Sequence, residues 1–127
     1  MRKIWVLAAL LLLTACTTRP ILNFHNEPVP TRFSEQHAHT QSDVERAILI
    51  AAQRRKWSAR VVRSGLIEAS TAARSHQARV EISYSATAYS VQYKSSSNLG
   101  QSDGTIHRNY NRWVANLNKE IKRQLLR

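Results

Sequence analysis

The sequence predicts a small α+β domain: an N-terminal helix, a four-stranded antiparallel meander and a C-terminal helix, with both helices packed on one face of the sheet. Three observations predict it. Apolar residues repeat at helical spacing over 44–52 and 106–125, and they alternate with polar residues between 57 and 93. The chain has 127 residues, enough for one small domain. Two helices can cover the apolar face of such a sheet in a two-layer fold.

The first helix is expected to begin at Ser42. Ser42 and Glu45 have the spacing of a capping box, and Asp43 adds negative charge to the first turn. One face of the helix then carries the apolar residues Val44, Ala47, Ile48, Ala51 and Ala52. The basic run at 54–56 suits the C-terminal end of the helix dipole, so these cations have a structural explanation.

Four segments alternate between apolar and polar residues, and each is expected to form a strand with one apolar face. They are residues 57–61, 67–71, 80–84 and 89–93. Ser64-Gly65 forms a plausible turn between the first two segments. These features favour an antiparallel meander.

The C-terminal helix has the longest and clearest amphipathic pattern in the chain. After a loop at 98–104, apolar residues recur at spacings of three and four: Ile106, Tyr110, Trp113, Val114, Leu117, Ile121 and Leu125. The loop contains Gly100 and Gly104, and free N–H groups at the following helix could hold an anion. Asp103 would repel such an anion, so a turn with a helix cap is favoured.

Residues 1–15 have the features of a signal peptide. Arg2 and Lys3 precede a ten-residue apolar run at 4–13, which is too short to span a bilayer as a helix of about 20 residues. The sequence Leu-Thr-Ala-Cys at 13–16 resembles a bacterial lipobox. This resemblance implies cleavage before Cys16 and a diacylglyceryl group on its thiol. The alternative is a conventional signal in which Cys16 is incidental.

Two further features concern the region after the predicted cleavage site. Thr17 rather than Asp follows the cysteine, and by resemblance to proteobacterial sorting this implies the outer membrane, with the domain facing the periplasm. All three prolines lie in the polar segment 16–41, which lacks any helical or strand period. We therefore expect a flexible tether there, followed by a folded domain at 42–127.

Part of the chain resembles a known group of proteins. Trp57 and the segments 65–69, 80–84 and 106–113 are similar to a group of small lipoproteins of Gram-negative bacteria that has no assigned activity. The likeness spans most of residues 42–126. The resemblance implies a cellular location and a fold, but it assigns no site residues.

The sequence does not favour an enzyme. It contains no phosphate-binding Walker loop and no Gly-x-Ser-x-Gly nucleophile elbow. His76 and His107 are candidate bases without an identifiable nucleophile. Glu68 and Glu81 could face each other across adjacent strands, but exposed partners for arginine are the plainer interpretation. No cofactor is expected.

A metal site is not expected either. His25, His37 and His39 lie in the predicted tether, and His37 and His39 could share a metal ion. A structural zinc site normally needs four ligands in a fixed geometry, which a flexible segment does not supply.

The charge of the chain gives the best candidate for a binding surface. Without residues 1–15, 17 basic and 8 acidic residues remain, a net charge of +9. Four cations recur close to one face of the C-terminal helix: Arg108, Arg112, Lys119 and Lys122. They could bind an anionic partner or simply form a solvated face.

We therefore expect a membrane-anchored envelope lipoprotein with a basic, non-enzymatic interaction domain. Its partners would be the membrane, through the lipid anchor, and an envelope protein or anionic polymer. The alternative is a binding module for an anionic ligand, such as an acidic glycan or a lipid phosphate, and a cell-wall enzyme is the weaker third possibility. Nucleic acid is not an expected partner, because a protein anchored in the envelope would not meet it there. The sequence also has no known DNA- or RNA-binding motif.

Overall fold

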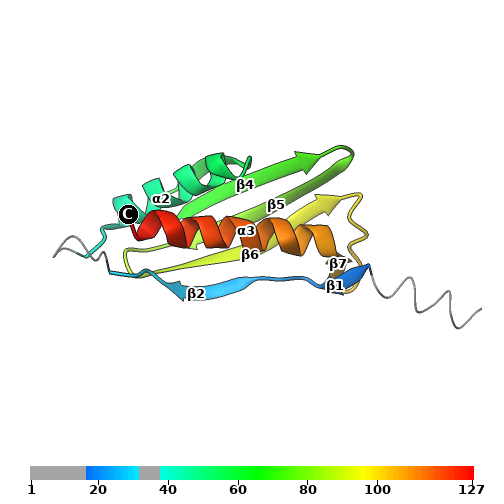
Figure 1. Ribbon diagram of the computed structural model, residues 1–127, viewed down its shortest axis with the longest axis horizontal. Coiled ribbons are helices and arrows are strands. Elements are labelled where there is room, and N and C mark those ends of the chain that lie inside the picture. The colour runs from blue at the N-terminus through cyan, green and yellow to red at the C-terminus, as the bar shows by residue number, and fades with distance from the viewer. Residues whose placement is uncertain (1–16, 32–37) are drawn as a thin grey trace, which may run out of the picture.

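The structure is a computed structural model and describes residues 17–31 and 38–127 (Figure 1). Its elements follow in the order β1 (Thr18–Pro20), β2 (Phe24–Pro28), α2 (Gln41–Arg54), β3 (Ser58–Arg63), β4 (Leu66–Ala73), β5 (His76–Tyr84), β6 (Ala88–Ser97), β7 (Thr105–His107) and α3 (Arg108–Leu125). The predicted α+β class is confirmed.

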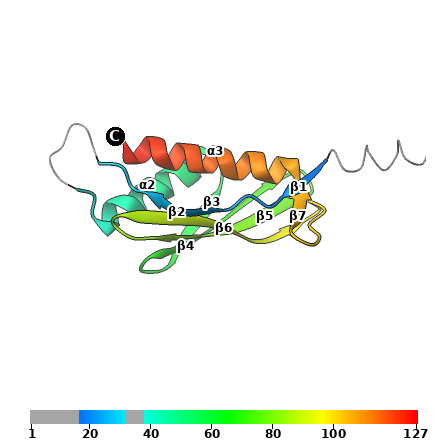
Figure 2. The ribbon, with the colours of Figure 1, turned by 90° about the horizontal axis from the view of Figure 1, so that it is seen from below.

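Five strands form an antiparallel sheet in the order β2-β6-β5-β4-β3, and β1 pairs with β7 in a separate two-stranded sheet. The predicted meander corresponds to β3 through β6. Figures 1 and 2 show α3 lying lengthwise over one face of the large sheet, with α2 beside it. The two helices pack against each other as well as on the sheet. The result is a two-layer domain with one face of the sheet covered.

The register of the strands places the apolar residues on the covered face. Ile82 of β5 pairs with Ile67 of β4 on one side and with Val91 of β6 on the other, and all three are fully buried. The helices contribute Ile48, Val114 and most of the other apolar residues predicted for their inner faces, whereas Trp113 is only half-buried. Because side chains alternate across a strand, the intervening residues lie on the uncovered face.

The N-cap of helix α2 lies two residues earlier than expected. Thr40 rather than Ser42 is the N-cap: its Oγ1 accepts a 3.1 Å hydrogen bond from the amide of Asp43, and its own amide donates to Asp43 Oδ2 at 2.9 Å. This pair is a capping box in which Asp43 takes the role predicted for Glu45. Glu45 is free to accept a 2.5 Å hydrogen bond from Tyr84 Oη instead.

The predicted flexible tether at 16–41 is wrong for the residues that form β1 and β2. Strand β2 pairs with β6, with an irregularity between Phe24 and Glu27. Pro28 is tolerated because β2 is an edge strand, which hydrogen-bonds to a neighbour on one side only. Four half-buried side chains of this region pack on the core: Ile21, Leu22, Phe24 and Val29. The folded domain therefore begins well before residue 42.

Helix α3 also differs in detail at its start. Ile106 is buried but belongs to β7, and His107 is the N-cap, with its Nδ1 accepting a 3.2 Å hydrogen bond from the amide of Asn109. Strand β7 lies between the glycine-containing loop and α3. An anion held in that loop would therefore not lie at the N-terminus of α3.

The far end of α3 is held by a residue from the predicted tether. His39 is only 6% exposed, and its Nε2 lies 2.8 Å from the carbonyl oxygen of Leu125. Carbonyl groups in the last turn of a helix have no partner inside the helix, so this contact satisfies one of them. His39 is thus a structural residue rather than an incidental polar one.

Candidate anion-binding face of helix α3

Helix α3 carries the four cations predicted for the binding surface, and all four are exposed. We call this set, Arg108, Arg112, Lys119 and Lys122, the basic stripe. The opposite face of the helix is buried through Tyr110, Val114, Leu117, Ile121 and Leu125. Because the apolar face is fixed on the sheet, the basic stripe points into solvent.

One member of the basic stripe differs from the other three. Lys122 Nζ lies 3.3 Å from Oε2 of Glu27 in β2. Arg108, Arg112 and Lys119 have no carboxylate within 4.0 Å among the residues that the structure describes. Three cations of the stripe are therefore available to an external anion, while Lys122 already has an internal partner.

The asparagines of α3 have separate roles. Asn111 accepts a 3.0 Å hydrogen bond from the amide of Leu22 and donates one of 2.9 Å to the carbonyl of Pro20, which fastens the segment between β1 and β2. Asn118 is buried and accepts a 2.5 Å hydrogen bond from Tyr89 Oη. Asn116 is exposed, and within the described residues it alone of these three has the freedom to meet a ligand.

Carboxylates elsewhere in the domain are engaged by cations. On the uncovered face of the sheet, Glu68 pairs directly with Glu81 across β4 and β5, as the sequence suggested it could. Lys94 lies between them, 2.7 Å from Glu68 and 3.1 Å from Glu81. Arg60 and Arg79 approach the same Glu68 oxygen at 3.4 and 3.8 Å. A hydrogen bond and charge from Lys94, together with Arg60, hold the pKa of Glu68 below its usual value.

Glu120 is a second engaged carboxylate and is only 4% exposed. Its burial disfavours ionisation, but the hydrogen bond from Gln124 and the charges of Arg123, Arg54 and Arg55 outweigh burial, so the pKa of Glu120 is lowered. Because these acids are neutralised inside the domain, its excess positive charge is left on exposed groups such as the basic stripe.

A hollow of about 260 Å³ lies beside the basic stripe and was not predicted. We call it the tryptophan hollow. Its lining comes from the end of α2, the end of β4 and the middle of α3, and includes Arg55, Lys56, Trp57, Thr71, Trp113 and Asn116. Trp57 is 4% exposed, whereas Trp113 is half-buried. Sequence patterns assigned both rings to the core, which is why the hollow was missed.

Lys56 at the rim of the tryptophan hollow has an unusual backbone. The amide of Lys56 bonds to the carbonyl of Gln53 and that of Trp57 to Ala52, which together form a Schellman motif at the end of α2. Lys56 occupies the left-handed position with φ +62°, where glycine is usual. A side chain in this conformation costs about 1 kcal/mol relative to glycine.

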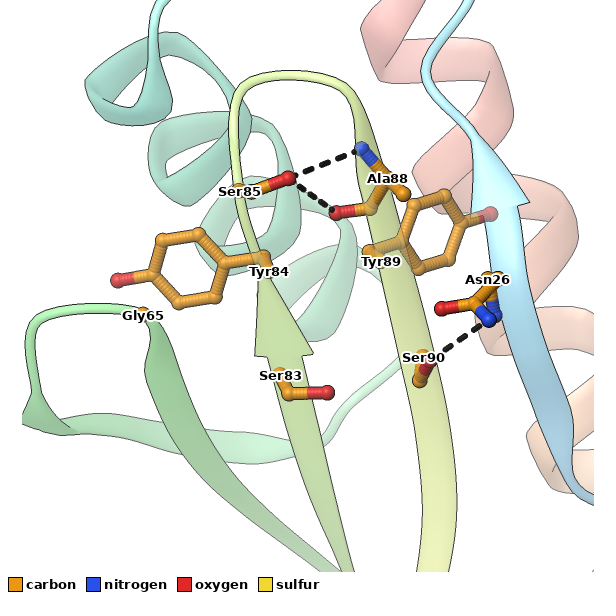
Figure 3. A pocket seen from close by; sticks show the side chains of 8 residues that line it. All are labelled: Asn26, Gly65, Ser83, Tyr84, Ser85, Ala88, Tyr89 and Ser90. Carbon is orange, nitrogen blue, oxygen red and sulfur yellow. Dashed lines mark hydrogen bonds between the residues drawn. The ribbon is translucent and has the colours of Figure 1, made fainter.

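A second hollow, of about 230 Å³, lies at the turn between β5 and β6 (Figure 3). Its lining is uncharged and includes Gly65, Tyr84 and three serines. Gly65 has φ +83°, and a Cβ there would lie 3.3 Å from the Tyr84 carbonyl oxygen. Burial and the hydrogen bond to Glu45 raise the pKa of Tyr84 to about 12. The lining therefore supplies neither a base near neutral pH nor a charge that would attract an anion.

The described histidines each contact a hydrogen-bonding group of the fold. His76 Nδ1 lies 2.6 Å from the carbonyl of Asn98, and His25 lies 3.5 Å from Gln92 Nε2. Within residues 17–31 and 38–127, no three His, Cys, Asp or Glu side chains gather in a way that could hold a metal ion. His37 lies outside the described residues, so the expectation that His37 and His39 hold no metal ion stays a prediction.

The predicted membrane anchor also lies outside the described residues. Cys16 and the predicted signal peptide are not among the described residues. Neither described helix is both long and apolar enough to cross a bilayer.

The fold and the α3 surface define a small two-layer α+β domain with an exposed basic helix face. No family model, no curated protein and no solved structure matches the chain. The resemblance to a group of small lipoproteins stays a prediction.

Proposed function

We propose that this chain is a lipid-anchored envelope protein whose domain binds an anionic envelope component, a protein or a polymer, through the basic stripe. The observation that carries the proposal is the exposure of Arg108, Arg112 and Lys119 on one face of α3, with no carboxylate within 4.0 Å among the described residues. Three like charges held on a rigid helix attract an anion without first breaking internal ion pairs.

The proposed location, anchored in the outer membrane, supports this function. The lipobox at Cys16 implies two or more acyl chains on the mature N-terminus, and two chains hold a protein stably on a membrane. The Thr17 that follows favours the outer membrane, with the domain in the periplasm. A basic domain in that position meets anionic envelope surfaces rather than nucleic acid.

We also propose that the domain is non-enzymatic. The residues that line the hollow at the β5–β6 turn include three serines and no histidine or carboxylate. His76 and His107 hydrogen-bond to the backbone of the fold and lie outside that lining. These features support binding rather than catalysis.

The binding proposal is tested by reversing two positive charges either in the basic stripe or elsewhere on the surface. The full-length Arg112→Glu/Lys119→Glu variant should lose capture of anionic envelope fractions, whereas Arg46→Glu/Arg63→Glu should retain it. All four residues are exposed, so both variants should melt like the wild type. Added salt should weaken capture by the wild type, because the Debye length falls from about 10 Å at 0.1 M to about 3 Å at 1 M.

Two results would contradict the proposal. Equal losses in both double variants would show that only net charge matters, without a defined surface. Undiminished capture by Arg112→Glu/Lys119→Glu would show that the basic stripe is a solvated face.

The anchor is tested separately by metabolic labelling with a fatty acid. The wild-type protein should incorporate the label and Cys16→Ser should not. Label retained on Cys16→Ser would place the acyl group elsewhere and remove the basis for the proposed address.

A further inference from the structure

The tryptophan hollow combines features that point to a particular class of anion. Trp57 and Trp113 both line it, and Trp113, being half-buried, offers the larger accessible apolar surface. Arg55 and Lys56 supply positive charge at the end of α2, and Thr71 supplies a hydroxyl. Simple polyanions such as phosphate chains have no apolar face that would use the two rings.

The tryptophan hollow is continuous with the basic stripe. Asn116, which lines the hollow, follows Arg112 by four residues and precedes Lys119 by three. Residues at these spacings are neighbours on the surface of a helix. The hollow thus has cations on two sides: those of α2 at one rim, and those of α3 at the other.

One polar atom at the α2 rim is left without a hydrogen-bond partner in the described part of the chain. Among the described residues, Arg55 Nε is buried without a hydrogen-bond partner, although it forms a 3.9 Å ion pair with a Glu120 oxygen. Lys56 holds a left-handed backbone that glycine would adopt without strain. A buried donor without a partner is one that a bound ligand could satisfy.

We propose that the tryptophan hollow binds one ring of an acidic saccharide, whose chain then continues along the basic stripe. This inference rests on the proposed function and names its ligand class. A sugar ring has an apolar C–H face that packs on an indole, hydroxyls for Asn116 and Thr71, and a carboxylate for Lys56 or Arg55. The hollow of about 260 Å³ is smaller than the roughly 300–1,000 Å³ typical of drug-sized ligand sites, which suits a single ring.

The tryptophan content provides a direct readout. The chain has three tryptophans, and the proposed cleavage before Cys16 removes Trp5, so the mature protein keeps only the two that line the hollow. Titration of this protein in detergent with oligogalacturonate, a linear chain of acidic sugars, should change its tryptophan fluorescence saturably. Neutral maltohexaose should produce no saturable change at the same concentrations.

Two variants of this protein locate the binding site. Lys56→Gly removes a cation and relieves the left-handed strain, so it should melt no lower than its parent while binding oligogalacturonate roughly tenfold more weakly. Trp113→Leu keeps an apolar side chain and should also weaken binding, measured by calorimetry. Arg63→Gln removes a cation at the far end of β3, six residues and about 20 Å along the strand from Trp57, and should leave the affinity unchanged.

Measuring the binding of polyphosphate as well distinguishes failure of this inference from failure of the proposed function. If oligogalacturonate binds no better than polyphosphate, and Lys56→Gly and Trp113→Leu bind both normally, the hollow is not the site although the basic stripe still binds anions. If neither polyanion binds the parent protein, both proposals fail. Calorimetric binding of oligogalacturonate without any change in tryptophan fluorescence would also overturn the assignment to the hollow.

Discussion

The ammonium group of Lys122 lies 3.3 Å from Oε2 of Glu27, and this ion pair joins helix α3 to the edge strand β2. The Lys122 side chain is 48% exposed, so solvent screens the pair, and such surface pairs contribute about 0.2–1 kcal/mol. The contact separates Lys122 from the rest of the basic stripe.

Charge reversal should reveal this difference. Lys122→Glu places two acidic groups together and should lower the free energy of unfolding by about 1 kcal/mol, whereas Lys119→Glu should leave it unchanged. Thermal melts of the two single variants measure the effect. Restoration of stability by Glu27→Lys in the Lys122→Glu background would support the pair, and equal melting of both single variants would contradict it.

Removal of the N-terminal strands should destabilise the domain. A chain of residues 40–127, which the sequence pattern suggested would fold by itself, lacks β2, the packing of Phe24 and Leu22, and the His39 contact with Leu125. We expect it to unfold at a denaturant concentration lower than residues 17–127, with a loss of roughly 3 kcal/mol or more. Coincident unfolding curves for the two chains would show that these strands contribute nothing to stability.

Two buried tyrosines should respond in opposite ways to loss of the hydroxyl. Tyr89→Phe leaves buried Asn118 without its 2.5 Å hydrogen bond and should cost about 1–3 kcal/mol. The Tyr110 hydroxyl is buried without a partner in the described part of the chain, so Tyr110→Phe should be neutral or stabilising. The Tyr110 ring would still make its edge-to-face contact with Tyr93, at 5.4 Å between centroids. Urea unfolding compares the two variants, and a larger loss for Tyr110→Phe would refute the expectation.

The Glu68 cluster should make stability depend on acid. Its carboxylate has a pKa below the ordinary 4.5 in the folded protein, because Lys94 and Arg60 favour the charged form. The stabilisation is therefore complete above the unfolded pKa and is lost as pH falls through the lower folded pKa. Glu68→Gln should be less stable at neutral pH and should lose less stability on acidification than the wild type.

Melting temperatures measured between pH 7 and pH 3 test this expectation. Glu81→Gln is the matched control, because Glu81 shares Lys94 but lacks the contacts of Glu68 with Arg60 and Arg79. A smaller effect is expected for the control. Parallel pH profiles for Glu68→Gln and the wild type would show that the cluster does not contribute to the acid dependence.

Most of the fold was predictable because its signals are local. The alternation around Ile67, Ile82 and Val91 and the helical period of α3 reflect which side chains one element buries, so neighbouring residues carry the information. The basic stripe was predictable for the same reason, since the side opposite a buried helical face is exposed. The helix cap was predicted at Ser42 instead of Thr40 because Ser42 and Glu45 have the same spacing as Thr40 and Asp43.

Strand β2 was not predictable in this way. Its five residues, Phe24–Pro28, include a proline and a bulge, so no regular alternation is visible. It is ordered because β6 offers a free edge and because Asn111 of α3 binds the preceding segment. His39 owes its burial to the end of α3. These interactions join residues far apart in the chain, so a local sequence pattern cannot predict them.

By itself, the sequence determined the α+β class, the order of the meander and C-terminal helix, and the exposure of the four cations on α3. Only the tertiary structure decided that Lys122 has an internal partner in Glu27, and that Trp57 and Trp113 meet beside Lys56 in a hollow. The physical reason is that periodicity records which face of an element avoids water, whereas a binding site depends on which faces of different elements come together.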